Sequence, residues 1–137
     1  MKDELIVFSK PKSNISEDIR TIRTNLKFTA NDDAKVLLVT SSVPGEGKSF
    51  ISANLAAAFA QTGEKVLLVD ADLRLGRVHK IFNQSAAKGF SNMLISGTSE
   101  DLPEYIKKTT IPNLYIVSRG TCLLYTSPSP RDRQKSR

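Results

Sequence analysis

The segment "KVLLVTSSVPGEGKSF", residues 35–50, decides how this chain folds. It opens with a continuous apolar run, "KVLLVT" at 35–40, which is typical of a parallel strand covered on both faces. A loop follows at 41–47, and the alanine-rich "KSFISANLAAAFAQTG" then predicts a helix that ends at Gly63. A strand, a glycine-containing loop and a helix in this order predict a phosphate-binding loop.

The chemistry of this loop follows from its backbone. Glycines at 45 and 47 let successive N–H groups approach a phosphate, and the positive end of the helix dipole adds to the attraction. Lys48 can reach the β- and γ-phosphates, and the Ser49 hydroxyl can bind Mg²⁺. The usual pattern G-x-x-x-x-G-K-[ST] has a glycine where this chain has Ser42, which is a small change if that residue keeps a negative φ. The expected nucleotide-binding residues are Pro44, Gly45, Glu46, Gly47, Lys48, Ser49 and Phe50.

A second motif, "VLLVDADLR" at 66–74, places two carboxylates after another buried strand, "KVLLVD" at 65–70. The carboxyl ends of parallel strands line the ligand crevice of an α/β sheet. Asp70 and Asp72 could therefore hold Mg²⁺ beside a triphosphate and accept a proton from an attacking hydroxyl. The structural alternative is a helix-capping aspartate with a solvated neighbour.

The rest of the chain fits an α/β fold. Residues 1–13 are expected to be an N-terminal arm, in which 4–8 could form a short edge strand. A helix capped by Asn14 or Ser16 should run to about Phe28, with an apolar stripe of Ile15, Ile19, Ile22 and Leu26. Short helices are predicted within 77–84, 89–96 and 101–109, and a third strand at 113–120. This order predicts a parallel sheet flanked by helices.

Composition excludes several classes of function. The chain has 137 residues, 39% hydrophobic and 25% charged, which suits one globular domain. It shows no signal peptide or transmembrane segment, and its single cysteine cannot form an internal disulfide, so the cytoplasm is the expected compartment. Half of the net charge of +6 lies in the last sixteen residues, which hold four basic residues and one acidic residue. The body is only mildly basic, so no nucleic-acid partner is predicted.

The final segment, 122–137, is expected not to be native. "CLLYTSPSPRD", Cys122 to Asp132, resembles the translation of a transposon-end sequencing adapter. The alternative is a natural, flexible basic tail, which its prolines and lack of periodicity also fit.

Taken together, "EDIRTIRTN", "SSVPGEGKS", "VLLVDADLR" and "RVHKIF" resemble the bacterial tyrosine kinases of capsule and exopolysaccharide synthesis, across about residues 10–120. The resemblance implies a P-loop NTPase-like domain, here residues 14–121, that uses ATP and Mg²⁺ for autophosphorylation on tyrosine. It implies catalytic roles for Lys48, Asp70 and Asp72. Ser49 and one of the two aspartates would organise Mg²⁺, and the other aspartate would assist the tyrosine hydroxyl.

The resemblance also implies partners. An E-x-x-R-x-x-R pattern, which mediates ring-like self-association in this family, falls on Glu17, Arg20 and Arg23. On charge spacing alone, these residues could equally form a solvated helix face with a weak ion pair. Family members of this type are activated by the cytoplasmic segment of a membrane adaptor, of the polysaccharide co-polymerase type. The adaptor recruits them to the membrane, where they phosphorylate protein tyrosines.

Two departures from the family pattern define the alternatives. The family's second acidic strand motif, Walker B, and its tyrosine cluster are absent from this sequence, so a C-terminally truncated domain is expected. Tyr105 and Tyr115 are expected to pack, as is His79. A partitioning ATPase of the ParA/MinD type would carry a lysine early in the loop, where this chain has Val43. A non-catalytic nucleotide-binding regulator is the other alternative.

Overall fold

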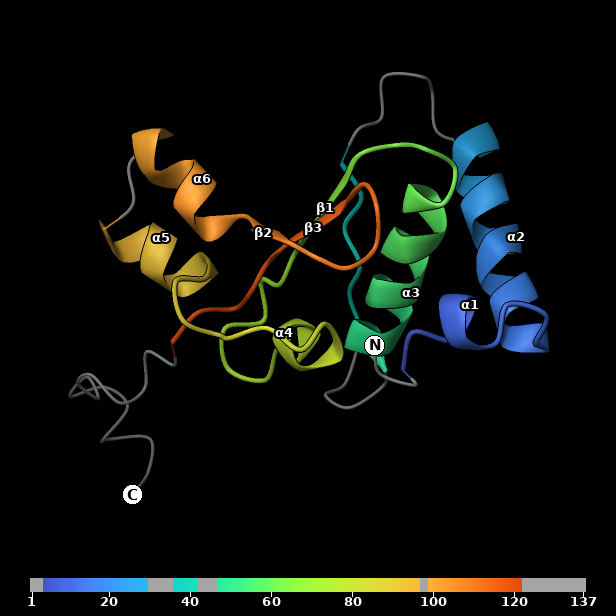
Figure 1. The fold of residues 1–137 in the computed structure, drawn as a ribbon, viewed down its shortest axis with the longest axis horizontal. Coiled ribbons are helices and arrows are strands. Elements are labelled where there is room, and N and C mark those ends of the chain that lie inside the picture. The colour runs from blue at the N-terminus through green and yellow to red at the C-terminus, as the bar shows by residue number, and fades with distance from the viewer. Residues whose placement is uncertain (1–3, 30–35, 42–46, 97–98, 122–137) are drawn as a thin grey trace.

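The computed structural model describes residues 4–29, 36–41, 47–96 and 99–121. Within these ranges the chain forms short and long helices around a small sheet (Figure 1). The helices are α1 (Ile6–Ser9), α2 (Asn14–Thr29), α3 (Lys48–Ala60), α4 (Val78–Ile81), α5 (Phe90–Ser96) and α6 (Leu102–Tyr105), with a 3-10 turn at Ser99–Asp101 before α6. The strands are β1 (Val66–Val69), β2 (Lys107–Lys108) and β3 (Leu114–Val117).

The sheet has the order β1-β3-β2. β1 and β3 pair in parallel, with Val66 opposite Leu114 and Val69 opposite Val117, which confirms the expected parallel pairing. β2 pairs antiparallel with β3, so the sheet is mixed. The sequence did not predict this two-residue strand because its charged "KK" carries no alternating apolar pattern.

Helix α3 lies between α2 and the sheet, while α5 and α6 lie on the other side of the sheet (Figure 1). Its alanines explain this central place, because small side chains let neighbouring elements approach closely on two sides. Ala53, Ala57 and Ala60 join one buried cluster with Leu114 of β3. Leu55 and Ala58 join a second cluster against α2. Past its end, Gly63 has φ +91°, the left-handed conformation expected of a helix-terminating glycine.

The N-terminal residues are part of this core. The edge-strand alternative for 4–8 is wrong, because residues 6–9 form the helical turn α1. Leu5 and Val7 are 1% and 0% exposed, one in each buried cluster. Burying two aliphatic side chains stabilises the fold by about 3–6 kcal/mol before chain entropy is subtracted, so the arm is an integral element.

Residues 36–40 do not form the predicted buried strand. Val36 and Leu38 are 93% and 85% exposed. A strand requires a neighbour for its backbone N–H and C=O groups. Both sides of β3 are taken by β1 and β2, and the segment 36–41 joins neither outer edge of the sheet. The apolar run thus has the composition of a strand without a partner.

The apolar stripe of α2 is only partly buried. Ile19 is 2% exposed and Leu26 packs beside it, whereas Ile15 and Ile22 are 47% and 43% exposed, contrary to expectation. Residues 19 and 26 are seven apart and so form one narrow seam, which is all that the slender, alanine-rich α3 covers. The predicted short helices at α4, α5 and α6 are confirmed.

Candidate functional site

The site begins where α3 begins. Gly47 precedes the helix with φ +76°, and its carbonyl accepts the N–H of Ile51 at 2.9 Å. A residue with a Cβ would be strained in this left-handed conformation, which explains the glycine. Lys48, Ser49 and Phe50 then form the first turn, where unpaired N–H groups create a positive end. The expected contacts from Pro44, Gly45 and Glu46 lie outside the described residues.

Asp70 follows β1 and organises the loop that comes next. Its Oδ1 accepts the N–H of Asp72 at 3.2 Å, and its Oδ2 accepts the N–H of Val78 at 3.2 Å. The side chain is buried. A Cβ on Gly76 would lie 2.3 Å from Asp70 Oδ2, so the loop closes over the carboxylate only because residue 76 is glycine. Asp70 therefore holds residues 72–78 in a tight turn.

Asp72 faces the first turn of α3. Its Oδ2 lies 3.5 Å from Lys48 Nζ, and its Oδ1 accepts the N–H of Leu75 at 3.0 Å. Both Asp72 and Lys48 are partly exposed. Their contact joins two motifs 24 residues apart, so the structure brings together the lysine and one aspartate that the sequence predicted as neighbours.

The pKa values of the two aspartates are shifted in opposite directions. Burial raises the pKa of Asp70, although the N–H groups of Val78 and Asp72 oppose the effect. The pKa of Asp72 is lowered, first by the N–H of Leu75 and then by the charge of Lys48. Environments that separate the pKa values of two carboxylates are typical of sites that assign them different roles.

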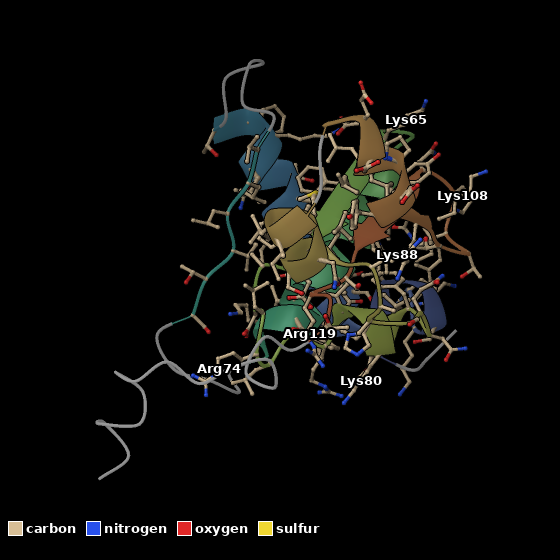
Figure 2. The ribbon with its side chains drawn as sticks, turned by 90° about the vertical axis from the view of Figure 1, so that its left-hand side faces the viewer. Lys65, Arg74, Lys80, Lys88, Lys108 and Arg119 are labelled. Atoms are coloured by element: carbon tan, nitrogen blue, oxygen red, sulfur yellow. The ribbon has the colours of Figure 1, made fainter. Side chains whose placement is uncertain are left out.

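Arg119, just after β3, is a site residue that the sequence analysis missed. Val117 of β3 pairs with Val69 of β1, so Arg119 lies close to the carboxyl end of β1. Its charge opposes the rise in the pKa of Asp70 and adds to the lowering of the pKa of His79. Figure 2 shows Arg74, Lys80 and Arg119 at one end of the molecule, and Lys65 and Lys108 at the other. The signal that could have found Arg119 is its position at the end of a parallel strand.

His79 packs, as expected. It is 8% exposed, and its Nδ1 has no hydrogen-bond partner among the described residues. Burial lowers the pKa of His79, and the charges of Arg119, Lys80 and Lys107 lower it further. The imidazole is thereby kept neutral.

The predicted self-association residues lie on α2, away from the two aspartates. Glu17 is exposed. The Arg20 guanidinium donates to the Pro11 carbonyl at 2.7 Å, and Arg23 donates to the Ala58 carbonyl at 2.9 Å. Both arginines thus also stabilise this chain internally.

Within residues 4–29, 36–41, 47–96 and 99–121, no three His, Cys, Asp or Glu side chains gather as a metal site. Over the same ranges, no helix has the length and apolar character needed to cross a membrane.

Comparisons with known proteins agree with this geometry. The model of the CobQ/CobB/MinD/ParA nucleotide binding domain family matches residues 37–117. The putative tyrosine-protein kinase CapB of Staphylococcus aureus is 40% identical over 129 residues, covering 93% of this chain and 54% of CapB. The tyrosine-protein kinase YwqD of Bacillus subtilis (strain 168) is 47% identical over 121 residues, covering 88% of this chain and 50% of YwqD.

Solved structures give the same result. The kinase domain of the Escherichia coli tyrosine kinase ETK matches with a TM-score of 0.80 and 30% identity, over 95% of this chain and 48% of that domain. The chimerical protein CapA2B2 matches with a TM-score of 0.80 and 37% identity, over 99% of this chain and 60% of the chimera. The expected fold and the resemblance to bacterial tyrosine kinases are confirmed. The chain spans about half the length of the curated relatives CapB and YwqD.

Proposed function

Since this chain belongs to the CobQ/CobB/MinD/ParA family of nucleotide-binding domains, we propose that its site binds ATP with Mg²⁺ and serves a protein-tyrosine kinase of capsule or exopolysaccharide synthesis. The observation that carries the proposal is the contact of Lys48 Nζ with Asp72 Oδ2 at the start of α3, in a chain 47% identical to the tyrosine kinase YwqD. The partitioning-ATPase alternative has only the coarse family in its favour.

The residues present fit a magnesium ion. Ser49 offers a hydroxyl and Asp72 a carboxylate, and oxygen ligands of this kind are those that Mg²⁺ prefers. Of the two carboxylate oxygens of Asp72, Oδ2 contacts the Lys48 ammonium group and Oδ1 accepts the backbone N–H of Leu75. When bound, Mg²⁺ would neutralise the charge that develops on the phosphates.

Lys48 would also neutralise charge on the phosphates. In the structure its ammonium group extends from the first turn of α3 to Asp72, in the loop that follows β1. We assign it to the β- and γ-phosphate oxygens, with the residues 44–50 supplying backbone contacts. Arg74, Lys80 and Arg119 at the same end of the molecule add positive potential for a triphosphate (Figure 2).

Asp70 is assigned to the tyrosine hydroxyl. Asp72 faces Lys48, which leaves Asp70 as the proton acceptor, and its raised pKa makes it a stronger base than an ordinary aspartate. Because the Asp70 carboxylate is buried and accepts the N–H groups of Asp72 and Val78, the loop 72–78 would have to open for the tyrosine hydroxyl to reach it. The tyrosine oxygen would give its proton to Asp70 and bond to the γ-phosphorus. The bond from that phosphorus to the β–γ bridging oxygen would break, and ADP would leave.

The acceptor tyrosine would come from another polypeptide or from another part of a longer chain. Tyr105 is 7% exposed and Tyr115 is partly buried. A phosphate acceptor must reach a catalytic site, so these two residues are better suited to packing. We further propose recruitment to the membrane through an adaptor of the polysaccharide co-polymerase type, and ring-like self-association through Glu17, Arg20 and Arg23.

A non-catalytic nucleotide-binding regulator is the second candidate, because the family model that matches residues 37–117 describes nucleotide binding alone. Two measurements separate the proposals. The first is binding of a fluorescent ATP analogue to this chain, with and without Mg²⁺. The second is phosphotyrosine formation by the full-length kinase carrying this sequence.

Lys48→Met should abolish both signals, and Lys65→Met is the matched control because Lys65 lies at the opposite end of the molecule (Figure 2). If ATP binds but tyrosine is never labelled by the full-length protein, the kinase proposal fails and the regulator stands. If Lys48→Met binds ATP as well as the unaltered chain, the assigned site is wrong.

A further inference from the structure

The N-terminal residues lie beside the candidate site. Figure 1 shows α1, which belongs to this segment, beside α3. We call residues 4–10 the N-terminal strap. Its contacts reach both of the elements that carry the site residues, although the sequence analysis assigned it no function.

Asn54 attaches the strap to α3. This side chain is 0% exposed, and its Nδ2 donates to the Glu4 carbonyl at 2.8 Å and to the Phe50 carbonyl at 2.9 Å. Its Oδ1 accepts the N–H of Val7 at 3.1 Å. An amide has two donor hydrogens and a carbonyl acceptor, and here each is used. One buried side chain therefore joins the strap to the turn that begins with Lys48.

The strap also reaches the loop at residues 70–78, which carries Asp70 and Asp72 and is here called the aspartate loop. Glu4 Oε1 lies 3.2 Å from Arg77 Nη2. Arg77 directly precedes Val78, whose N–H binds the Asp70 carboxylate. The backbone of Glu4 is thus tied to α3, and its side chain is tied to the loop that presents Asp72.

The other end of the strap is fixed to α2. Ser16 Oγ donates to the carbonyls of Ile6 at 3.0 Å and Lys10 at 2.7 Å. Ser16 is itself fully buried. The strap is therefore anchored along its length, so loss of the Glu4–Arg77 pair would weaken the attachment of the loop 70–78 to the strap while the strap stayed in place.

We propose that the N-terminal strap positions the loop 70–78 relative to the first turn of α3, with Asn54, Glu4 and Arg77 as positioning residues. The inference rests on the proposed function for its consequence, because the distance between Asp72 and Lys48 would set affinity for ATP and Mg²⁺. None of the three residues touches the reacting groups. Their effect passes through Asp70, Asp72 and Lys48.

Hydrogen exchange of this chain tests the proposal without a ligand. Glu4→Gln removes the ion pair and keeps the backbone contacts of residue 4. An exposed pair of this kind corresponds to a roughly one-and-a-half- to fivefold change in a local opening equilibrium. The amides of Leu75 and Val78 should exchange faster by that factor. Glu4→Arg combined with Arg77→Glu should restore protection.

Glu64→Gln is the matched control, because it removes another exposed ion pair, Lys27–Glu64 at 2.8 Å, that touches neither the strap nor the loop. It should leave the exchange of 70–78 unchanged. The strap has no positioning role if Glu4→Gln leaves loop exchange unchanged, or if Glu64→Gln accelerates it equally.

Binding of a fluorescent ATP analogue with Mg²⁺ gives the functional readout. Glu4→Gln should weaken binding by a similar one-and-a-half- to fivefold factor, and the charge-swapped pair should recover it. Equal affinity of Glu4→Gln and the unaltered chain would overturn the link to the site. If the unaltered chain binds no ATP, the proposed function fails, while the exchange experiment still decides the role of the strap.

Discussion

Gly76→Ala tests how tightly the aspartate loop is built. A Cβ at residue 76 would lie 2.3 Å from Oδ2, 2.4 Å from Oδ1 and 2.5 Å from Cγ of Asp70. The carboxylate cannot move away freely, because it is buried and accepts the N–H groups of Asp72 and Val78. Either the loop must open or Asp70 must give up a hydrogen bond.

The size of the effect follows from these two costs. Overpacking in a close-packed region destabilises by about 1–3 kcal/mol. Loss of one hydrogen bond to a charged acceptor adds about 1.5–3 kcal/mol. If both costs apply, the expected loss in the free energy of unfolding is about 2.5–6 kcal/mol, a large part of the total of about 5–15 kcal/mol that a domain usually has. The midpoint of thermal unfolding should fall by roughly 10–20 °C.

Chemical denaturation followed by circular dichroism measures this loss. Gly63→Ala is the control, because Gly63 has φ +91° but nothing within 4 Å of an added Cβ. It should lose only about 1–2 kcal/mol from backbone strain. In an Asp70→Ala background the clash is absent, so the additional loss from Gly76→Ala should fall below about 1 kcal/mol. A loss at Gly76 no larger than at Gly63, or one that persists without the Asp70 carboxylate, refutes the steric argument.

Three further predictions concern stability and association. The pKa of His79, the single histidine, is lower in the folded than in the unfolded protein. The stability that the neutral imidazole contributes is therefore fully present above the unfolded pKa, near 6.5, and is lost as the pH falls toward the folded pKa. His79→Leu should remove this pH dependence from thermal melts between pH 5 and 7. Leu38→Lys should leave unfolding within about 0.5 kcal/mol but reduce concentration-dependent light scattering, because Leu38 is 85% exposed. Ile19→Ala should cost about 2–4 kcal/mol in denaturant titrations, and Ile22→Ala under about 1 kcal/mol, because only Ile19 is buried.

A different experimental result would contradict each of these predictions. An unchanged slope of stability against pH in His79→Leu would place the acid sensitivity on another group. Undiminished scattering by Leu38→Lys would show that a different surface associates. Equal losses at Ile19 and Ile22 would contradict the narrow seam between α2 and α3.

Two copies of the same tetrapeptide show where prediction from this sequence succeeds and fails. "VLLV" occurs at 36–39 and at 66–69. The second copy forms β1 and pairs with β3, as predicted, while the first forms no strand. Composition identifies a segment that favours a strand, but the strand itself depends on a neighbour that lies far away in the sequence. No local pattern carries that information.

The helices were easier to predict because their hydrogen bonds are local. The α2 and α3 segments and the glycine at 63 matched expectation within a few residues. The stripe of α2 was overestimated, because its periodicity gives the apolar face but does not tell how wide a neighbour will cover it.

The sequence patterns assigned Lys48 and the two aspartates to one site but predicted none of the contacts that hold these residues. Lys48 contacts Asp72 because α3 begins beside the loop that follows the carboxyl end of β1. The bond from Asp72 N–H to Asp70 is a local aspartate turn, which the spacing D-x-D could have suggested. Asn54 contacts residues that lie 47 and 50 positions away in the sequence, and no local pattern in an alanine-rich helix predicts such contacts.

The attachment of Glu4 has a practical consequence for handling the protein. An affinity tag or fused partner at the N-terminus would be joined only three residues before Glu4, whose carbonyl and carboxylate are both bonded. Such an addition would pull or crowd the element next to the nucleotide site, so affinities measured with an N-terminal tag should differ from those measured after its removal. Extra residues left at this end after a tag is cleaved would alter the measured affinities of all variants in the same way.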